Sequence, residues 1–142
     1  LLLPPLLLEL VQSGRWRQPT DEKIQSLIPF LREPVDFTRF GFEETWGYSQ
    51  LHLVDDPRFS SFFQEYRGSA GIERELPWLD AEKAVFIAVN REIGDDIGIA
   101  LDYRTNASDP RVVASDWGAE YRRCDWRLVD ERFSDFVRRI DL

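Results

Sequence analysis

The stretch of residues 76–117 most constrains what this chain can fold into, because three apolar runs follow one another there with short acidic turns between them. The runs read LPWLDAEKAVFIAVN, GDDIGIALDYR and DPRVVASDW. Short runs rich in β-branched and aromatic residues, bounded by Gly, Pro, Asn or Asp, are typical of β-strands joined by tight turns. The stretch therefore predicts a sheet built from segments that are neighbours in the chain.

The first run is apolar on both sides of an extended backbone. Because side chains alternate along a strand, one face is expected to carry Val85, Ile87 and Val89, and the other Phe86 and Ala88. A strand with two apolar faces is expected to be central in its sheet and covered on each side. Helices must then pack against the sheet.

The remaining runs predict three further strands. Residues 97–103 alternate between two faces, and GDD at 94–96 suits a hairpin turn, so 84–90 should pair antiparallel with 97–103. Turn residues separate them from a strand at 111–115, and a polar connection leads to another at 126–129. The simplest topology for these four strands is an antiparallel meander.

Several helices are predicted before the sheet. Pro5 suits the first position of a helix, and Thr20 is a candidate N-cap for a second helix that Pro29 keeps short or kinked. Residues 56–68 place aromatic side chains at helical spacing and predict a third helix. Residues 35–52 fit neither period, so we expect at most one short helix there.

A last helix is predicted after the sheet, with Asp130 as its N-cap. Its apolar stripe can close over one face of the sheet and consists of Phe133, Phe136, Val137 and Ile140. The predicted fold is α+β in a single domain, 1–142, with helices mainly in 1–68, a loop at 69–71, and the sheet and last helix in 76–142.

Composition limits the kinds of partner. The 142 residues include 18 basic and 26 acidic ones, which gives a formal net charge of −8. Such a surface repels phosphate polyanions, so we expect no direct nucleic-acid binding, whereas a basic protein is a suitable partner. The length is close to the commonest size of one domain.

The cysteine content favours a reducing compartment. The single Cys124 excludes an intramolecular disulfide, and one histidine cannot complete a cysteine–histidine zinc site. The opening LLLPPLLLEL has no preceding basic residue, is divided by two prolines and is too short to cross a bilayer as a helix. We therefore expect a cytoplasmic protein that does not bind membranes.

The order of these motifs resembles the SUKH superfamily, which groups fungal cell-wall assembly regulators of the Smi/Knr-like type with bacterial toxin-immunity proteins. The resemblance covers residues 76–140 and is strongest in WLDAEKAVFIAVN, DDIGIALDYR, PRVVASDW and WRLVDERFSDFV. Its elements are a lead-in at Trp78 and Leu79, an acidic hairpin before an IALD-like strand, a strand that ends near Trp117, and a final helix with Phe133.

The resemblance implies a non-enzymatic, protein-binding function without a cofactor. An immunity-type protein would bind and neutralise a bacterial toxin that acts in the cytoplasm, such as a nuclease, and its partner would be a basic toxin domain. The alternative within the family is a regulatory scaffold of the cell-wall assembly type. The oligomeric state is left open by the sequence.

Aromatic residues beside acidic ones are the candidate partner-binding positions, because an aromatic anchor near carboxylates suits a basic partner. Core packing is the alternative role for each tryptophan, since large aromatics commonly stabilise strands. The candidates are Trp78, Asp95, Asp96, Asp116, Trp117, Glu120, Tyr121 and Trp126.

Catalysis and metal binding are weaker hypotheses, and we expect neither. His52 and Cys124 could form a base and a nucleophile but lie in no recognisable motif. The aspartates of the turns could bind a hard cation or serve an Asp-dependent hydrolase, yet their spacing matches no calcium loop. These aspartates are Asp95, Asp96, Asp102, Asp109 and Asp116.

Overall fold

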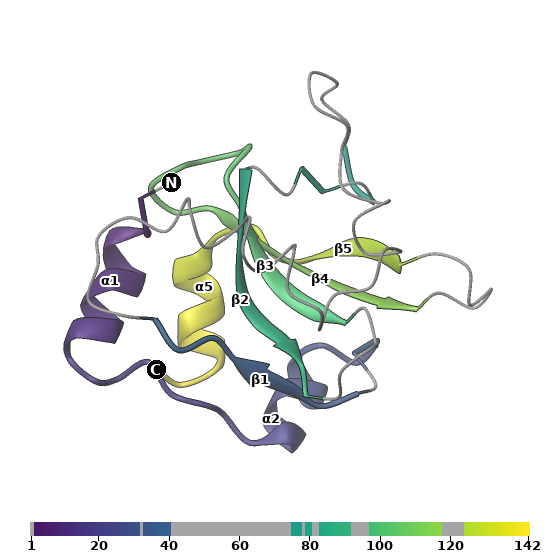
Figure 1. Ribbon diagram of the computed structural model, residues 1–142, viewed down its shortest axis with the longest axis horizontal. Coiled ribbons are helices and arrows are strands. Elements are labelled where there is room, and N and C mark those ends of the chain that lie inside the picture. The colour runs from purple at the N-terminus through teal and green to yellow at the C-terminus, as the bar shows by residue number, and fades with distance from the viewer. Residues whose placement is uncertain are drawn as a thin grey trace.

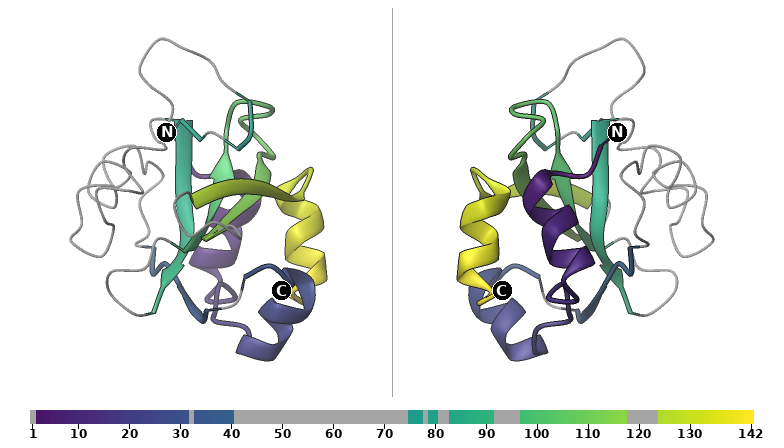
Figure 2. Two further views of the ribbon diagram at one scale, coloured as in Figure 1. Left: turned by 90° about the vertical axis from the view of Figure 1, so that its right-hand side faces the viewer. Right: turned by 90° about the vertical axis from the view of Figure 1, so that its left-hand side faces the viewer.

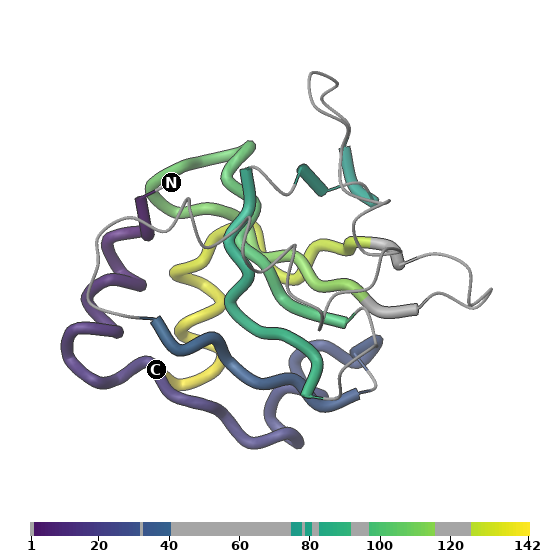
Figure 3. The backbone as a smooth tube through the Cα atoms, in the orientation of Figure 1, coloured from purple at the N-terminus to yellow at the C-terminus, as the bar shows by residue number. Residues whose placement is uncertain are grey.

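The computed structural model describes residues 2–31, 33–40, 75–77, 79–80, 83–91, 97–117 and 124–142. In these residues the chain forms a five-stranded antiparallel sheet with strand order β1-β2-β3-β4-β5 and three helices (Figure 1). The backbone tube in Figure 3 follows the strands from the blue β1 to the yellow-green β5. The predicted α+β class and the antiparallel meander are confirmed.

The four predicted strands are all present. They are β2 (Ala84–Asn90), β3 (Gly98–Asp102), β4 (Arg111–Trp117) and β5 (Cys124–Asp130). Every neighbouring pair is antiparallel, and β2 pairs with strands on both sides. All seven residues of β2 are buried, as expected for a central strand covered on both faces.

The predicted division of β2 into two faces is right only for its first half. Val85 and Ile87 pack with the helices and Phe86 packs on the opposite face, but Ala88 joins the helix side and Val89 the opposite side. The cause is a register shift between Phe86 and Ala88, since a bulge reverses the alternation beyond it.

Gly98 pairs with Val89, just beyond this bulge. A Cβ atom at this position would lie 2.9 Å from the carbonyl oxygen of Ala88, closer than real Cβ contacts allow. Glycine therefore permits the close approach of β3 to the bulged part of β2.

An additional strand, β1 (Val35–Phe37), forms one edge of the sheet. The prediction that residues 35–52 hold at most one short helix is wrong for these three residues; residues 41–52 lie outside the described ones. Val35 and Phe37 are buried and Asp36 is exposed, so the strand has period two. Three residues are too few for that period to be recognised in the sequence.

The two N-terminal helices begin as predicted. Helix α1 (Pro5–Gln12) has Pro5 at its first position, and α2 (Asp21–Leu27) begins after Thr20, whose hydroxyl oxygen accepts a hydrogen bond from the Lys23 amide at 3.2 Å. Helix α2 ends two residues before Pro29. The helix predicted at 56–68 and the loop predicted at 69–71 lie outside the described residues.

The helices α1, α2 and α5 (Phe133–Arg139) lie on one face of the sheet, as the two side views of Figure 2 show. We call the apolar layer between them and the strands the main core. It includes Leu7, Leu10, Ile24, Ile87, Ile99, Leu101, Val112, Phe133 and Phe136.

A smaller second core lies on the opposite face of the sheet. It includes Leu79, Phe86, Val113 and Trp126, and the rings of Phe86 and Trp126 meet edge to face at 5.7 Å between centroids. The amide of Trp126 also donates to the Pro77 carbonyl at 3.1 Å, which holds the lead-in segment beside β5. The lead-in is therefore part of the cover on this face.

The start of α5 differs from the sequence prediction. The N-cap position is Arg132, which forms no side-chain cap, and the predicted cap Asp130 instead accepts from Arg139 at 2.7 Å. Asp109, in the turn between β3 and β4, accepts hydrogen bonds from the Ser134 amide at 2.9 Å and the Ser134 hydroxyl at 2.7 Å. A carboxylate distant in sequence therefore caps α5. Its negative charge also interacts favourably with the positive end of the helix dipole.

Replacing Asp109 tests this long-range cap. We expect Asp109→Ala to lower the free energy of unfolding by about 1 kcal/mol, the usual cost of losing an N-cap. Urea denaturation followed by circular dichroism measures the change. Ser108→Ala, in the same turn and exposed, is the matched control and should stay within about 0.5 kcal/mol of the parent protein. Equal stabilities of the two variants would contradict the capping role.

Candidate functional site

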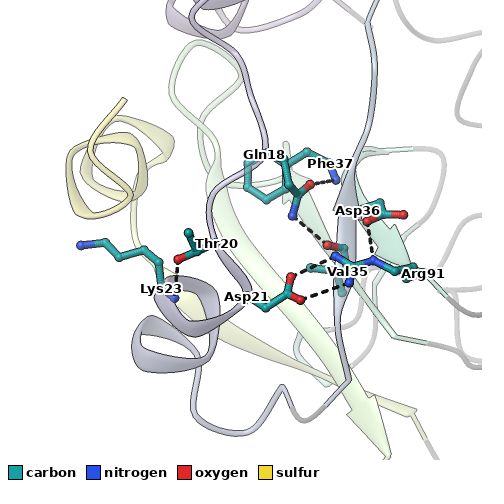
Figure 4. Close-up of polar contacts among 8 residues, drawn as sticks. All are labelled: Gln18, Thr20, Asp21, Lys23, Val35, Asp36, Phe37 and Arg91. Atoms are coloured by element: carbon teal, nitrogen blue, oxygen red, sulfur yellow. Dashed lines mark hydrogen bonds and ion pairs between the residues drawn. The ribbon is translucent and has the colours of Figure 1, made fainter.

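The outer edge of β1 is closed in part by a side chain. Thr38 donates to Ile87 and Arg91 to Pro34 across the β1–β2 ladder, so the backbone groups of Val35 and Phe37 point away from the sheet. The Gln18 amide meets them: its nitrogen donates to the Val35 carbonyl at 2.9 Å, and its oxygen accepts from the Phe37 amide at 2.6 Å (Figure 4). One glutamine thus occupies the place of a neighbouring strand.

Arg91 fastens the same region through charge. Its guanidinium donates to Asp36 on β1 at 2.8 Å and to both carboxylate oxygens of Asp21, at the start of α2, at 2.9 and 3.1 Å (Figure 4). Hydrogen bonds from Arg91, together with its positive charge, hold the pKa of Asp21 below its usual value. All three side chains are about half exposed, so the network orients α2 against β1 and contributes little stability.

A groove of about 580 Å³ lies beside the outer edge of β1, and we call it the β1 groove. Trp16 forms one wall, stacking on Phe37 at 4.8 Å between ring centroids and donating from its indole nitrogen to the Thr38 carbonyl at 2.9 Å. The described residues that line it are Val11, Trp16, Arg17, Gln18, Asp36, Phe37, Thr38, Arg39 and Phe40.

A second polar cluster is buried at the end of β3. The Asp102 side chain is fully buried and accepts from Arg104, through its backbone amide at 3.1 Å and its guanidinium at 2.9 Å, and from Arg111 at 2.9 Å. Arg111 also reaches Glu75 in the lead-in segment at 3.3 Å. The cluster therefore ties the β3–β4 turn to the lead-in.

The two arginines determine the charge state of Asp102. Burial by itself would raise the pKa of Asp102, but the hydrogen bonds from Arg104 and Arg111 and the charge of Arg104 outweigh it, and the pKa lies below its ordinary value. Asp102 is thus a fixed anion that neutralises nearby guanidinium charge. A carboxylate held in this way is unsuited to act as a general base near neutral pH.

We expect Asp102→Asn to lower the free energy of unfolding at pH 7 by about 3–5 kcal/mol, because it removes the buried anion that Arg104 and Arg111 share, and both arginines are largely buried. Asp36→Asn is the matched control, since this exposed carboxylate also pairs with an arginine and should cost about 1 kcal/mol or less.

The pH dependence of the stability difference between Asp102→Asn and the parent protein tests whether the negative charge of Asp102 is responsible. Because the folded-state pKa of Asp102 is depressed, its stabilisation is complete above the unfolded value of about 3.9 and is lost as pH falls through the folded value. The gap between Asp102→Asn and the parent protein should be constant above about pH 5 and narrow below about pH 4. Urea titrations from neutral to strongly acidic pH measure it, and a gap that does not narrow would contradict the ion-pair argument.

The structure does not describe most of the predicted partner-binding residues, so it does not show whether they lie together. Trp78, Asp95, Asp96, Glu120 and Tyr121 lie outside the described residues. Asp116 and Trp117 are the last two residues of β4. Trp126 is 3 % exposed and belongs to the second core, which is the alternative role considered for it. The predicted interface as a whole stays a prediction.

The structure describes some of the residues considered for catalysis or metal binding. Asp102 and Asp109, two members of the aspartate set, have structural partners, and Cys124 is the first residue of β5, while His52 lies outside the described residues. Among the described residues, the structure brings together no group of three or more potential metal ligands. None of the helices in these ranges has the length and apolar composition needed to cross a bilayer.

Sequence reasoning missed the β1 groove and the role of Gln18. A weak signal is present in the sequence, since RWRQ and TRF place arginine beside aromatic residues in a chain that is acidic as a whole. The sequence does not show that these two segments lie close together, because their proximity depends on β1 joining the sheet next to the α1–α2 connection.

Comparisons with known protein families, with curated proteins and with solved structures find no match to this chain.

Proposed function

We propose that this protein is a non-enzymatic binding module of the immunity type, which binds and neutralises a basic toxin domain that acts in the cytoplasm. The observation that carries the proposal is that Asp102 and Asp109, two members of the predicted aspartate set, both have structural partners. Asp102 is neutralised by two arginines and Asp109 caps α5, so neither is available for acid–base or metal chemistry. Function is then expected to reside in surfaces.

Two further features support the proposal. The resemblance to the SUKH superfamily rests on the motifs of residues 76–140, and it implies a toxin-immunity protein or a cell-wall assembly regulator. The net charge of −8 favours a basic protein partner over a direct nucleic-acid ligand. A cytoplasmic location follows from the same proposal, because an immunity protein must meet its toxin where the toxin acts.

Long-range charge attraction gives the first functional prediction. The association rate with a cognate basic toxin should fall at least about tenfold between low and high salt, because screening removes electrostatic steering. The dissociation rate should change much less. Stopped-flow association at several salt concentrations measures both rates, and an association rate that does not respond to salt would contradict the steering argument.

Partner capture separates the proposal from its alternatives. The tagged protein, purified from its native cells at low and moderate salt, should retain one stoichiometric basic partner whose toxicity it suppresses on coexpression. Several unrelated signalling or cell-wall proteins would favour the regulatory scaffold. An immunity protein is also essential only in cells that carry its toxin. The need for a regulatory scaffold does not depend on the presence of a toxin.

The Asp-dependent hydrolase is tested on the other aspartates of the predicted set, Asp95, Asp96 and Asp116. Joint substitution of Asp95, Asp96 and Asp116 should abolish no hydrolytic activity, because the proposal assigns no reaction to them; since they are candidate partner-binding residues, their replacement should instead weaken toxin binding. A substrate turned over by the parent protein and not by a folded triple variant would overturn the non-enzymatic assignment.

A further inference from the structure

We propose that the β1 groove is a second binding surface, which takes an extended acidic peptide segment of a partner protein by strand addition to the edge of β1. The proposal does not depend on the immunity function, because it concerns a different surface and the opposite sign of charge. Three independent features of the described part of the groove carry it: two arginines without a described carboxylate partner, a backbone edge without a described hydrogen-bond partner, and a fixed aromatic wall.

The arginines of the groove differ from most other described arginines in having no carboxylate partner among the described residues. Among the described residues, Arg91 faces Asp21 and Asp36, Arg111 faces Asp102, and Arg139 faces Asp130. Arg127 lies instead over the Phe30 ring. Within the described ranges, Arg17 and Arg39 are exposed and have no carboxylate partner. Two unpaired cations on one groove of an acidic protein are suited to an anionic ligand.

The backbone of β1 offers hydrogen bonds to the same ligand. Because the backbone groups of Val35 and Phe37 point away from β2, the Phe37 carbonyl lies on the outer side of β1, and the Arg39 amide follows just beyond the end of the strand. No described residue hydrogen-bonds to either group, whereas Gln18 already satisfies the Val35 carbonyl and the Phe37 amide. An added strand can therefore pair beside Gln18 without displacing it.

The aromatic wall gives the ligand an apolar surface. Trp16 is fixed by its hydrogen bond to Thr38 and by stacking on Phe37, and its ring lies 6.1 Å from that of Phe40. A strand presents alternate side chains to opposite sides. Acidic side chains of the ligand can contact the arginines while apolar ones contact the Trp16 ring.

A peptide fits these features better than a nucleic acid. Strand addition needs a donor and an acceptor on the ligand backbone, and a phosphodiester backbone has no donor. A polyphosphate chain would also meet the repulsion of a protein with a net charge of −8, whereas a short peptide carries only a few charges.

The test uses a fluorescent ten-residue peptide in which Glu alternates with Val, added to the full chain. We expect saturable binding by fluorescence anisotropy, and NMR shifts concentrated on the Arg39 amide and the Trp16 indole N–H. The double substitution Arg17→Ala and Arg39→Ala should weaken binding about tenfold, the effect of losing two exposed ion pairs. Both sites are exposed, so the thermal unfolding temperature should not change.

Matched controls separate this site from general charge effects. Arg132→Ala with Arg138→Ala removes the same charge from α5, whose arginines already pair with Asp135, and should leave peptide binding unchanged. A peptide with alternate backbone amides methylated on the β1-facing side should bind at least about tenfold more weakly, since it cannot form the added ladder. A peptide with Lys in place of Glu should not bind.

Four results would overturn the proposal. They are no binding of the Glu–Val peptide, equal weakening by the α5 double variant, equal binding of the methylated peptide, and preferential binding of a single-stranded oligonucleotide that displaces the peptide. None of these depends on the toxin, so the outcome is independent of the proposed immunity function.

Discussion

The fold depends on one constraint: the central strand β2 is apolar on both faces and must be covered on both. All seven of its residues are buried. The helices α1, α2 and α5 supply one cover, and Trp126 with the lead-in at Leu79 supplies the other. The bulge near Ala88 divides β2 between these two cores, and Gly98 lets the next strand approach the bulge closely. The layers of the molecule therefore follow from burying this one strand.

Charged side chains then fix the elements that the apolar layers only bring together. Asp102 joins the β3–β4 turn to the lead-in through Arg111, and Asp109 in the same turn caps α5 at Ser134. Arg139 of α5 reaches the Leu27 carbonyl at the end of α2 as well as Asp130 of β5. Since these carboxylates hold the structure, the functional hypotheses are better sought on surfaces than in an acidic cluster.

The positive and negative charges of the protein are unevenly distributed over its surface. The protein is acidic as a whole, which suits a basic partner, yet the β1 groove carries two arginines with no described partner. A protein with surfaces of opposite charge can contact two partners, or two parts of one partner, at the same time. Gln18 has a further role in this arrangement, because its amide protects the start of the β1 edge from uncontrolled pairing, whereas the Phe37 carbonyl has no hydrogen-bond partner among the described residues.

The sequence by itself determined the four strands of the meander, the starts of α1 and α2 and the acidic character, because alternation, capping residues and charge are local properties. It did not determine β1, whose three residues are too short to show a period, or the cap of α5, which comes from Asp109 rather than Asp130. The candidate site was equally hidden. Gln18, Arg17 and Arg39 acquire a role only when β1 joins the sheet beside the α1–α2 connection, and that pairing is a contact between segments that only the tertiary structure brings together.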